Sequence, residues 1–86
     1  MSAVVTCRGV HAPGLLARVA VVANPFPVCG LDYRVNAAGA LTLRVLVDGP
    51  PAAGERVAAR LRRVVGLTTV VLSVDSGAPV RATMTP

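Results

Sequence analysis

Two neighbouring segments of the chain alternate between apolar and polar residues with a period of two. They cover residues 28–36 and 40–48, and the residues Asn36-Ala37-Ala38-Gly39 between them are typical of a turn. Such alternation is typical of β-strands with one buried face, so the pair predicts a β-hairpin. In the first segment, the side expected to face the core carries Cys29, Leu31, Tyr33 and Val35. The opposite face of the hairpin is expected to carry Asp32, Arg34, Thr42 and Arg44.

Other secondary structure elements are expected on both sides of this hairpin. The β-branched runs over residues 2–8 and 67–75 each predict a strand. Apolar residues at helical spacing predict one helix from Leu15 to about Asn24, before Pro25. Its apolar stripe would consist of Leu15, Leu16, Val19, Val22 and Ala23. A second helix is expected to end near Gly66, with a stripe of Val57, Leu61, Val64 and Val65.

The predicted order is β-α-β-β-α-β, which defines the fold class. It indicates an α+β, ferredoxin-like sandwich in which two helices cover one face of a four-stranded antiparallel sheet. Residues 1–75 would form this domain, and residues 76–86, rich in Pro, Gly and Thr, would form a flexible C-terminal tail.

The composition indicates how the core is filled, whether the domain associates and where in the cell it is found. Hydrophobic residues make up 53% of the chain, yet it has one Phe and one Tyr, so Val, Leu and Ala must fill the core. A small domain this apolar is expected to keep exposed apolar surface, which predicts an oligomer. The richest apolar stretch, residues 14–31, contains Arg18 and is interrupted by Pro25 and Pro27, so no membrane span is expected. No signal-peptide pattern opens the chain, so we expect a cytoplasmic protein.

The net charge of +5 comes from nine arginines and four acidic residues. This balance is compatible with an acidic partner, including nucleic acid. However, the strands that stack bases in RNA-recognition domains carry no aromatic residue here, so nucleic-acid binding is not expected. Arg56, Arg60 and Arg63 form one helical stripe. It would be either a solvated face or a docking face for an acidic partner.

The sequence contains few residues that could bind a metal ion or catalyse a reaction. Cys7, His11 and Cys29 are the soft ligands of the chain, fewer than the four that a structural zinc site needs. The histidine has no acid before it on the same element, so no activated nucleophile is expected. Both cysteines are expected to be small buried hydrophobes. The sequence therefore predicts no metal, no cofactor and no catalytic residue.

The loop between the first strand and the first helix is the best candidate binding site. It reads His11-Ala12-Pro13-Gly14 and opens directly into the helix. The N-terminus of a helix offers free N–H groups and partial positive charge, which suit a carboxylate. The loop would be either an anion or amino-acid seat or a plain strand-to-helix turn.

The stretch HAPGLLARVAVV over residues 11–22 resembles the turn and helix of ACT domains, which are small amino-acid-sensing regulatory modules. The chain is most similar to the short single-ACT regulatory subunits of acetolactate synthase. Their Gly-x-Leu-x-Arg-Val pattern matches Gly14, Leu16, Arg18 and Val19 here. The end of the second helix, residues 61–67, also resembles the family pattern, and the similarity extends over residues 3–74.

This resemblance implies a non-catalytic regulatory subunit. It would bind and activate the thiamine-diphosphate-dependent catalytic subunit of acetolactate synthase, in branched-chain amino-acid biosynthesis. It also implies a homodimer with side-by-side sheets, with valine or another branched-chain amino acid bound between the chains. One chain would contribute His11, Ala12, Pro13, Gly14 and Leu15, and the other Cys29 and Gly30. Family members that bind valine well have Asn where this chain has His11 and Cys29, so weakened valine sensing is expected. The alternative is a free-standing ACT dimer that binds an amino acid and regulates another protein.

Overall fold

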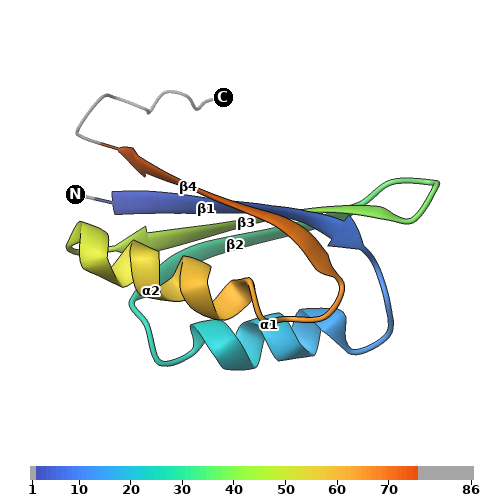
Figure 1. Ribbon diagram of the computed structural model, residues 1–86, viewed down its shortest axis with the longest axis horizontal. Coiled ribbons are helices and arrows are strands. Elements are labelled where there is room, and N and C mark those ends of the chain that lie inside the picture. Colours follow the sequence, from blue (N-terminus) through green and yellow to red (C-terminus); the bar gives the residue numbers. More distant parts are fainter. Residues whose placement is uncertain (1, 76–86) are drawn as a thin grey trace.

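The computed structural model describes residues 2–75 of the chain (Figure 1). The predicted tail, residues 76–86, lies outside the described residues. Four strands and two helices follow one another as β1 (Ser2–Val10), α1 (Leu15–Ala23), β2 (Val28–Val35), β3 (Ala40–Asp48), α2 (Pro51–Leu61) and β4 (Leu67–Asp75).

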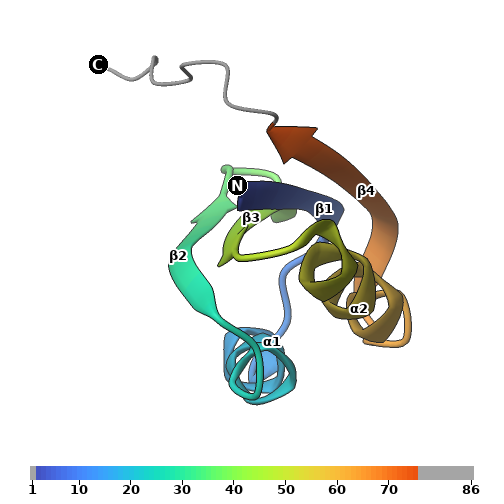
Figure 2. The ribbon, with the colours of Figure 1, turned by 90° about the vertical axis from the view of Figure 1, so that its left-hand side faces the viewer.

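The four strands form one antiparallel sheet in the order β2-β3-β1-β4. Both helices lie on the same side of this sheet, so the molecule has two layers (Figure 2). The ferredoxin-like prediction is confirmed. β1 and β3 occupy the centre, while β2 and β4 form the two edges.

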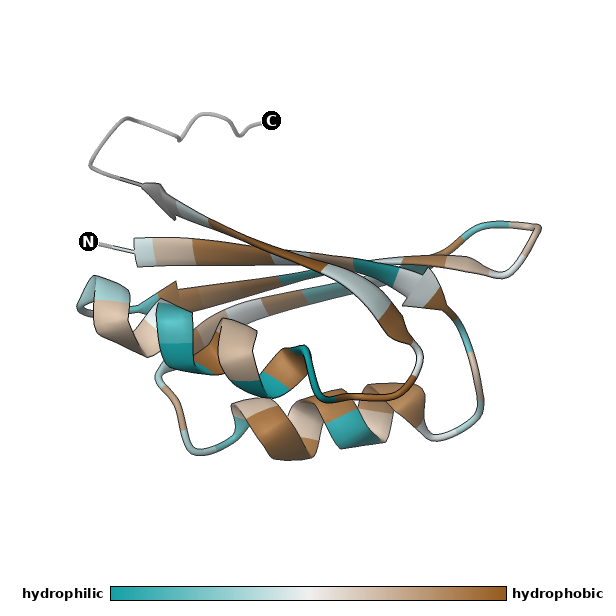
Figure 3. Ribbon diagram, in the orientation of Figure 1, coloured by the Kyte–Doolittle hydropathy of each residue, from teal (hydrophilic) through white to brown (hydrophobic). Residues whose placement is uncertain are grey.

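The predicted hairpin is confirmed, and β3 forms the floor of the core. Its alternate residues Leu41, Leu43, Val45 and Val47 are almost completely buried. Hydrophobic and hydrophilic residues alternate along the strands (Figure 3). From the helices, Leu15, Val19, Val57 and Leu61 complete this core. These aliphatic residues replace the aromatic ones that the composition lacks.

The outer face of the sheet also carries the predicted residues. Asp32 lies opposite Arg44 and Arg34 lies opposite Thr42 in the β2–β3 pairing. Directly opposed residues share one face of a sheet. Arg34 also forms an ion pair with Asp32, with 2.9 Å between Nε and Oδ1.

Two apolar residues predicted for the core lie outside it. Leu16 is 44% exposed, because α1 turns only the i, i+4, i+8 stripe that begins at Leu15 toward the sheet. Val65 is 80% exposed, because α2 ends at Leu61 and a turn follows. Within that turn Val64 points inward and is 8% exposed, while its neighbour points outward.

The second helix begins at Pro51, whose missing N–H costs nothing at the first helical position. Gly54, one turn later, is buried against β1. A Cβ there would lie 2.7 Å from the Cβ of Ala3, so a glycine lets the helix pack closely on the central strand. This close packing covers the half of the sheet formed by β1 and β4, whereas α1 lies beneath β2 (Figure 2).

Candidate functional site

The loop between β1 and α1 has the geometry of an open helix N-terminus. Gly14 has φ of 81°, a left-handed conformation that favours glycine. No side chain caps the helix, and the first turn starts with the N–H of Leu15 donating to the carbonyl of Ala12 at 3.1 Å. A Cβ at Gly14 would meet no atom within 4 Å, so the turn is open to its surroundings on that side.

His11 ties this loop to two distant parts of the chain. Its backbone N–H donates to the carbonyl of Gly39 in the hairpin turn at 3.0 Å. Its side-chain Nδ1 lies 2.8 Å from the hydroxyl of Tyr33 on β2, and the two rings meet edge to face. The alternation of β2 predicts Tyr33 on the core side of the strand, but no sequence pattern connects it with His11. The presence of a single tyrosine was the one sequence feature that could have drawn attention to this contact. Because the two residues are 22 positions apart, their contact produces no local sequence pattern.

Cys29 and Gly30, the other half of the predicted site, lie at the start of β2. The register of β2 against β3 shifts between Val28 and Gly30, so Cys29 is the extra residue of a β-bulge. Gly30 lies opposite Leu46 on the outer face. Tyr33 follows three residues later, about 10 Å further along the strand.

The structure therefore brings together the loop residues His11, Ala12, Pro13, Gly14 and Leu15, but not Cys29 or Gly30. Within one chain the two predicted halves lie toward opposite ends of β2.

The prediction that both cysteines are buried is half wrong. Cys7 is fully buried, and burial raises the pKa of its thiol to about 11, with a smaller opposing effect of Arg62. Cys29 is exposed, because the bulge removes it from the core face. Both are free thiols. Residues 2–75 contain no group of three His, Cys, Asp or Glu residues that could hold a metal ion.

The outer edge of β2 leaves apolar surface uncovered. Leu31 and Val35, which the pairing with β3 places on the core side, are 39% and 41% exposed. Beside them lies a hollow of about 220 Å³ between β2 and α1, lined in part by Ala20, Asn24 and Leu31. An edge strand with exposed apolar side chains is a ready site for pairing with another strand.

The predicted arginine stripe lies beside a second hollow. Arg56, Arg60 and Arg63 line it together with Phe26, and it holds about 480 Å³. The guanidinium of Arg60 lies 5.7 Å from the centre of the Phe26 ring, within range of a cation–π contact. The three arginines are exposed.

Neither α1 nor α2 is long and apolar enough to cross a membrane.

Comparison with known proteins gives the class of this fold. The structure is similar to the ACT domain from the GTP pyrophosphokinase of Chlorobium tepidum, with a TM-score of 0.71 and 17% identity. That match covers 85% of this chain and 97% of the other. It is also similar to the C-terminal domain of the MgtC protein from Mycobacterium tuberculosis, with a TM-score of 0.63 and 20% identity over 90% of this chain and 89% of the other.

The chain therefore has the fold of an ACT domain. Its sequence matches no family model. No curated protein matches it either.

Proposed function

We propose that this chain is a non-catalytic regulatory subunit that binds and activates the catalytic subunit of acetolactate synthase. The observation that carries this proposal is the turn at Gly14, where a left-handed glycine precedes an uncapped helix at the position that matches the Gly-x-Leu-x-Arg-Val pattern. The ACT fold of residues 2–75 supports the same reading. The fold alone hosts many functions, so the enzyme partner follows from the sequence resemblance.

The proposal includes a homodimer formed through the two β2 edges. A two-fold axis near the middle of β2 would pair these strands antiparallel into one eight-stranded sheet. Leu31 and Val35 of each copy would then lose their exposure to water. Such a pairing would also place Gly30 of the second copy near Tyr33 and His11 of the first. The two separated halves of the predicted effector site would meet between the chains.

An amino acid in that site would direct its carboxylate to the start of α1. The N–H groups there are uncapped, and the helix dipole favours negative charge. Selectivity for one amino acid depends on buried hydrogen-bonding groups. Here the Nδ1 atom of His11 already contacts Tyr33, which leaves Nε2 as its remaining ring nitrogen for a ligand. We therefore expect weak valine sensing together with retained activation.

Activation would work by a shift of population. Docking of the dimer would favour an active conformation that the catalytic subunit already samples. No group of this chain would enter the reaction, so its effect is expected on the fraction of active catalytic subunit.

The test is acetolactate formation by the catalytic subunit from the same organism, measured alone and with the chain added, with and without valine. Activation that is nearly insensitive to valine is the expected result. An unchanged rate together with no co-elution of the two proteins would remove the subunit proposal. Gly14→Val is a suitable variant, since a β-branched residue strains a left-handed turn. Gly49→Val, at φ of 101° in the turn between β3 and α2, is its matched control, because Gly49 lies away from the loop of His11.

The second candidate is a free-standing ACT dimer that senses an amino acid for another protein. The open start of α1 beside the His11–Tyr33 contact favours this candidate, because an amino acid could bind there without a catalytic subunit. A thermal-shift screen of the amino acids separates the two candidates. A specific ligand raises the unfolding midpoint by mass action, whereas a subunit without effector shows no such shift.

A further inference from the structure

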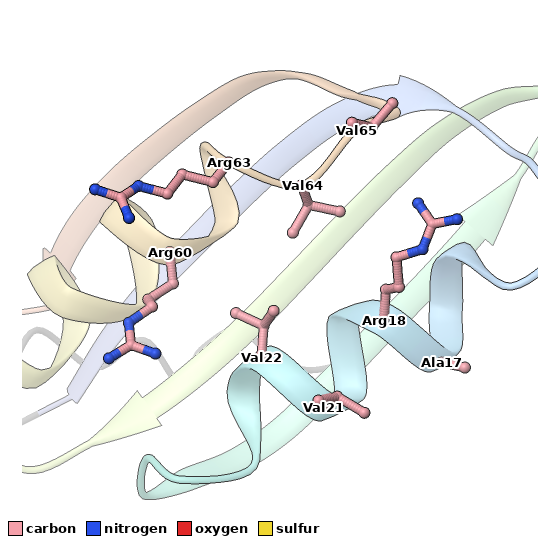
Figure 4. Close-up of a pocket in the computed structure, with 8 residues that line it drawn as sticks. All are labelled: Ala17, Arg18, Val21, Val22, Arg60, Arg63, Val64 and Val65. Atoms are coloured by element: carbon pink, nitrogen blue, oxygen red, sulfur yellow. The ribbon is translucent and has the colours of Figure 1, made fainter.

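The two helices leave an open groove between them on the side away from the sheet. It holds about 570 Å³, and we call it the helix groove. Its lining consists of Ala17, Arg18, Val21, Val22, Arg60, Arg63, Val64 and Val65. Figure 4 shows Val22 and Val64 between the helices, with Arg18 on one side and Arg60 and Arg63 on the other.

The helix groove is lined by apolar side chains, with Val22 and Val64 on its floor and two strongly exposed valines at its margins. Val65 is 80% exposed and Val21 is 72% exposed, the two highest values among the large hydrophobic residues of the part that the structure describes. That both line one groove makes them a patch and not scattered surface residues, and contiguous apolar patches mark interaction sites. The same exposure shows that the groove is open and does not enclose a small ligand.

The rim of the groove carries positive charge from both helices. Arg18 comes from α1, and Arg60 and Arg63 come from α2. Within residues 2–75 the observed ion pair joins Arg34 to Asp32, and none involves these three arginines. None of the residues that line the groove is acidic. Although Arg60 also lies over the ring of Phe26, no acidic side chain of residues 2–75 neutralises these charges, so they are accessible to a partner.

We propose that the helix groove binds an acidic amphipathic helix of a partner protein. A helix would place an apolar stripe on the valines and carboxylates on both flanks, toward Arg18 on one side and Arg60 and Arg63 on the other. The nine residues of α1 span about 14 Å, so the groove contacts between two and three turns of such a helix.

Other occupants match these features less well. A nucleic acid would place phosphates over the valine floor, where no aromatic side chain offers a stacking surface. An anionic membrane would meet the arginines and the exposed valines, but Val64, which is only 8% exposed, lies too deep between the helices to enter the lipid. The helix groove and the β2 edge also use different sides of α1. Arg18 and Val22 line the groove, whereas Ala20 and Ala23, on the opposite face of the helix, line the hollow beside β2.

This inference deepens the proposed function and rests on it for one point, that the partner is the regulated protein. The test therefore uses a synthetic peptide and not the catalytic subunit. The probe is a fluorescein-labelled helical peptide with leucines at i, i+3, i+4 and i+7 and glutamates on both flanks. Its control has the same composition, with the leucines distributed around the helix. Fluorescence anisotropy should show binding of the probe and at least tenfold weaker binding of the control.

Charge variants test the rim. The double change Arg60→Glu and Arg63→Glu should weaken probe binding at least tenfold. The matched control is Arg8→Glu with Arg44→Glu on the outer face of the sheet, which changes the net charge equally. It should alter binding less than threefold. Equal losses in both double variants would show a general charge effect and overturn the proposal.

Apolar variants test the exposed valines at the margins of the groove. Val21→Ser with Val65→Ser removes the two exposed valines of the groove without touching the core, and at least a fivefold loss of affinity is expected. The control is Val10→Ser with Val71→Ser, at 62% and 51% exposure elsewhere on the surface. Circular dichroism checks that each variant is folded. Binding of anionic phosphatidylglycerol vesicles without binding of the peptide would assign the groove to membranes and overturn the proposal.

The two proposals fail separately. A chain that binds the probe but activates no acetolactate synthase keeps the helix groove and loses the subunit role. A chain that activates the enzyme, with activation unaffected by Arg60→Glu and Arg63→Glu and no probe binding, keeps the subunit role and loses the groove.

Discussion

Strands β2 and β3 have equally regular sequence patterns but very different surroundings. In β3 the alternate residues Leu41, Leu43, Val45 and Val47 are at most 2% exposed. In β2 the corresponding residues Leu31 and Val35 are about 40% exposed. β3 has a strand on each side and both helices below it, whereas β2 has one neighbour and a free edge. Alternation in a sequence thus shows which face a residue occupies, but the neighbours decide whether that face is buried.

The largest expected difference between the two strands is in stability. Leu43→Ala in β3 should lower the free energy of unfolding by about 2–5 kcal/mol, since it leaves a cavity in the packed core. Leu31→Ala in β2 should cost less than about 1 kcal/mol in the monomer, because much of its surface is already in water. Urea unfolding at several protein concentrations measures both and separates any contribution of a dimer. Equal costs would contradict the contrast between centre and edge.

The two cysteines show the same contrast between centre and edge, and it predicts how the stability of the protein depends on pH. The thiol of Cys7 on the central strand β1 has its pKa raised from 9.0 to about 11 by burial. The unfolded chain therefore releases this proton at lower pH than the folded one, and stability is lost as the pH rises from 9 to 11. At about 1.4 kcal/mol for each pKa unit, the loss is ~3 kcal/mol.

Comparison of the wild type with Cys7→Ala isolates this contribution. The variant is less stable at neutral pH but should lose less stability between pH 9 and 11. Cys29→Ala, at the exposed bulge of β2, is the matched control and should keep the slope of the wild type. Parallel curves for all three proteins would show that the buried thiol does not govern alkaline stability.

How far the sequence predicts this molecule differs between its parts. The limits of β3 and β4 were predicted to the residue, because alternation and flanking turn residues are local properties. The loop from His11 to Gly14 was placed correctly for the same reason. The bulge at Cys29 was missed, since it arises from the register of β2 against β3, which a strand does not encode alone. The exposed position of Val65 was missed because α2 ends at Leu61, before the helical stripe predicted from the sequence is complete.

The free edge of β2 gives the next prediction, on assembly. Leu31→Lys with Val35→Lys places charges on the edge that we propose to pair, and charged residues block edge-to-edge association. The dissociation constant of the dimer should rise at least tenfold, about 1.4 kcal/mol. Light scattering coupled to size-exclusion chromatography measures it. Leu46→Lys with Val71→Lys, on the outer face of the sheet, is the matched control. A dimer that persists in the edge variant but not in the control would move the interface to the outer face.

The smallest expected effect concerns the contact that fastens the end of β2 to the loop before α1. Tyr33→Phe removes the hydroxyl that lies 2.8 Å from Nδ1 of His11. Since the pair is at the surface, the loss should be about 0.5–1 kcal/mol. His11→Ala and the double variant complete a cycle, in which the coupling energy should nearly equal the cost of Tyr33→Phe alone. A coupling energy of zero between His11 and Tyr33 would mean that only the pairing with β3 stabilises this end of β2. The loop before α1 would then be free to adjust around a ligand. A coupling of the expected size would mean that a ligand binding at Gly14 acts on a loop already fixed to the edge strand, through which it would reach a second chain.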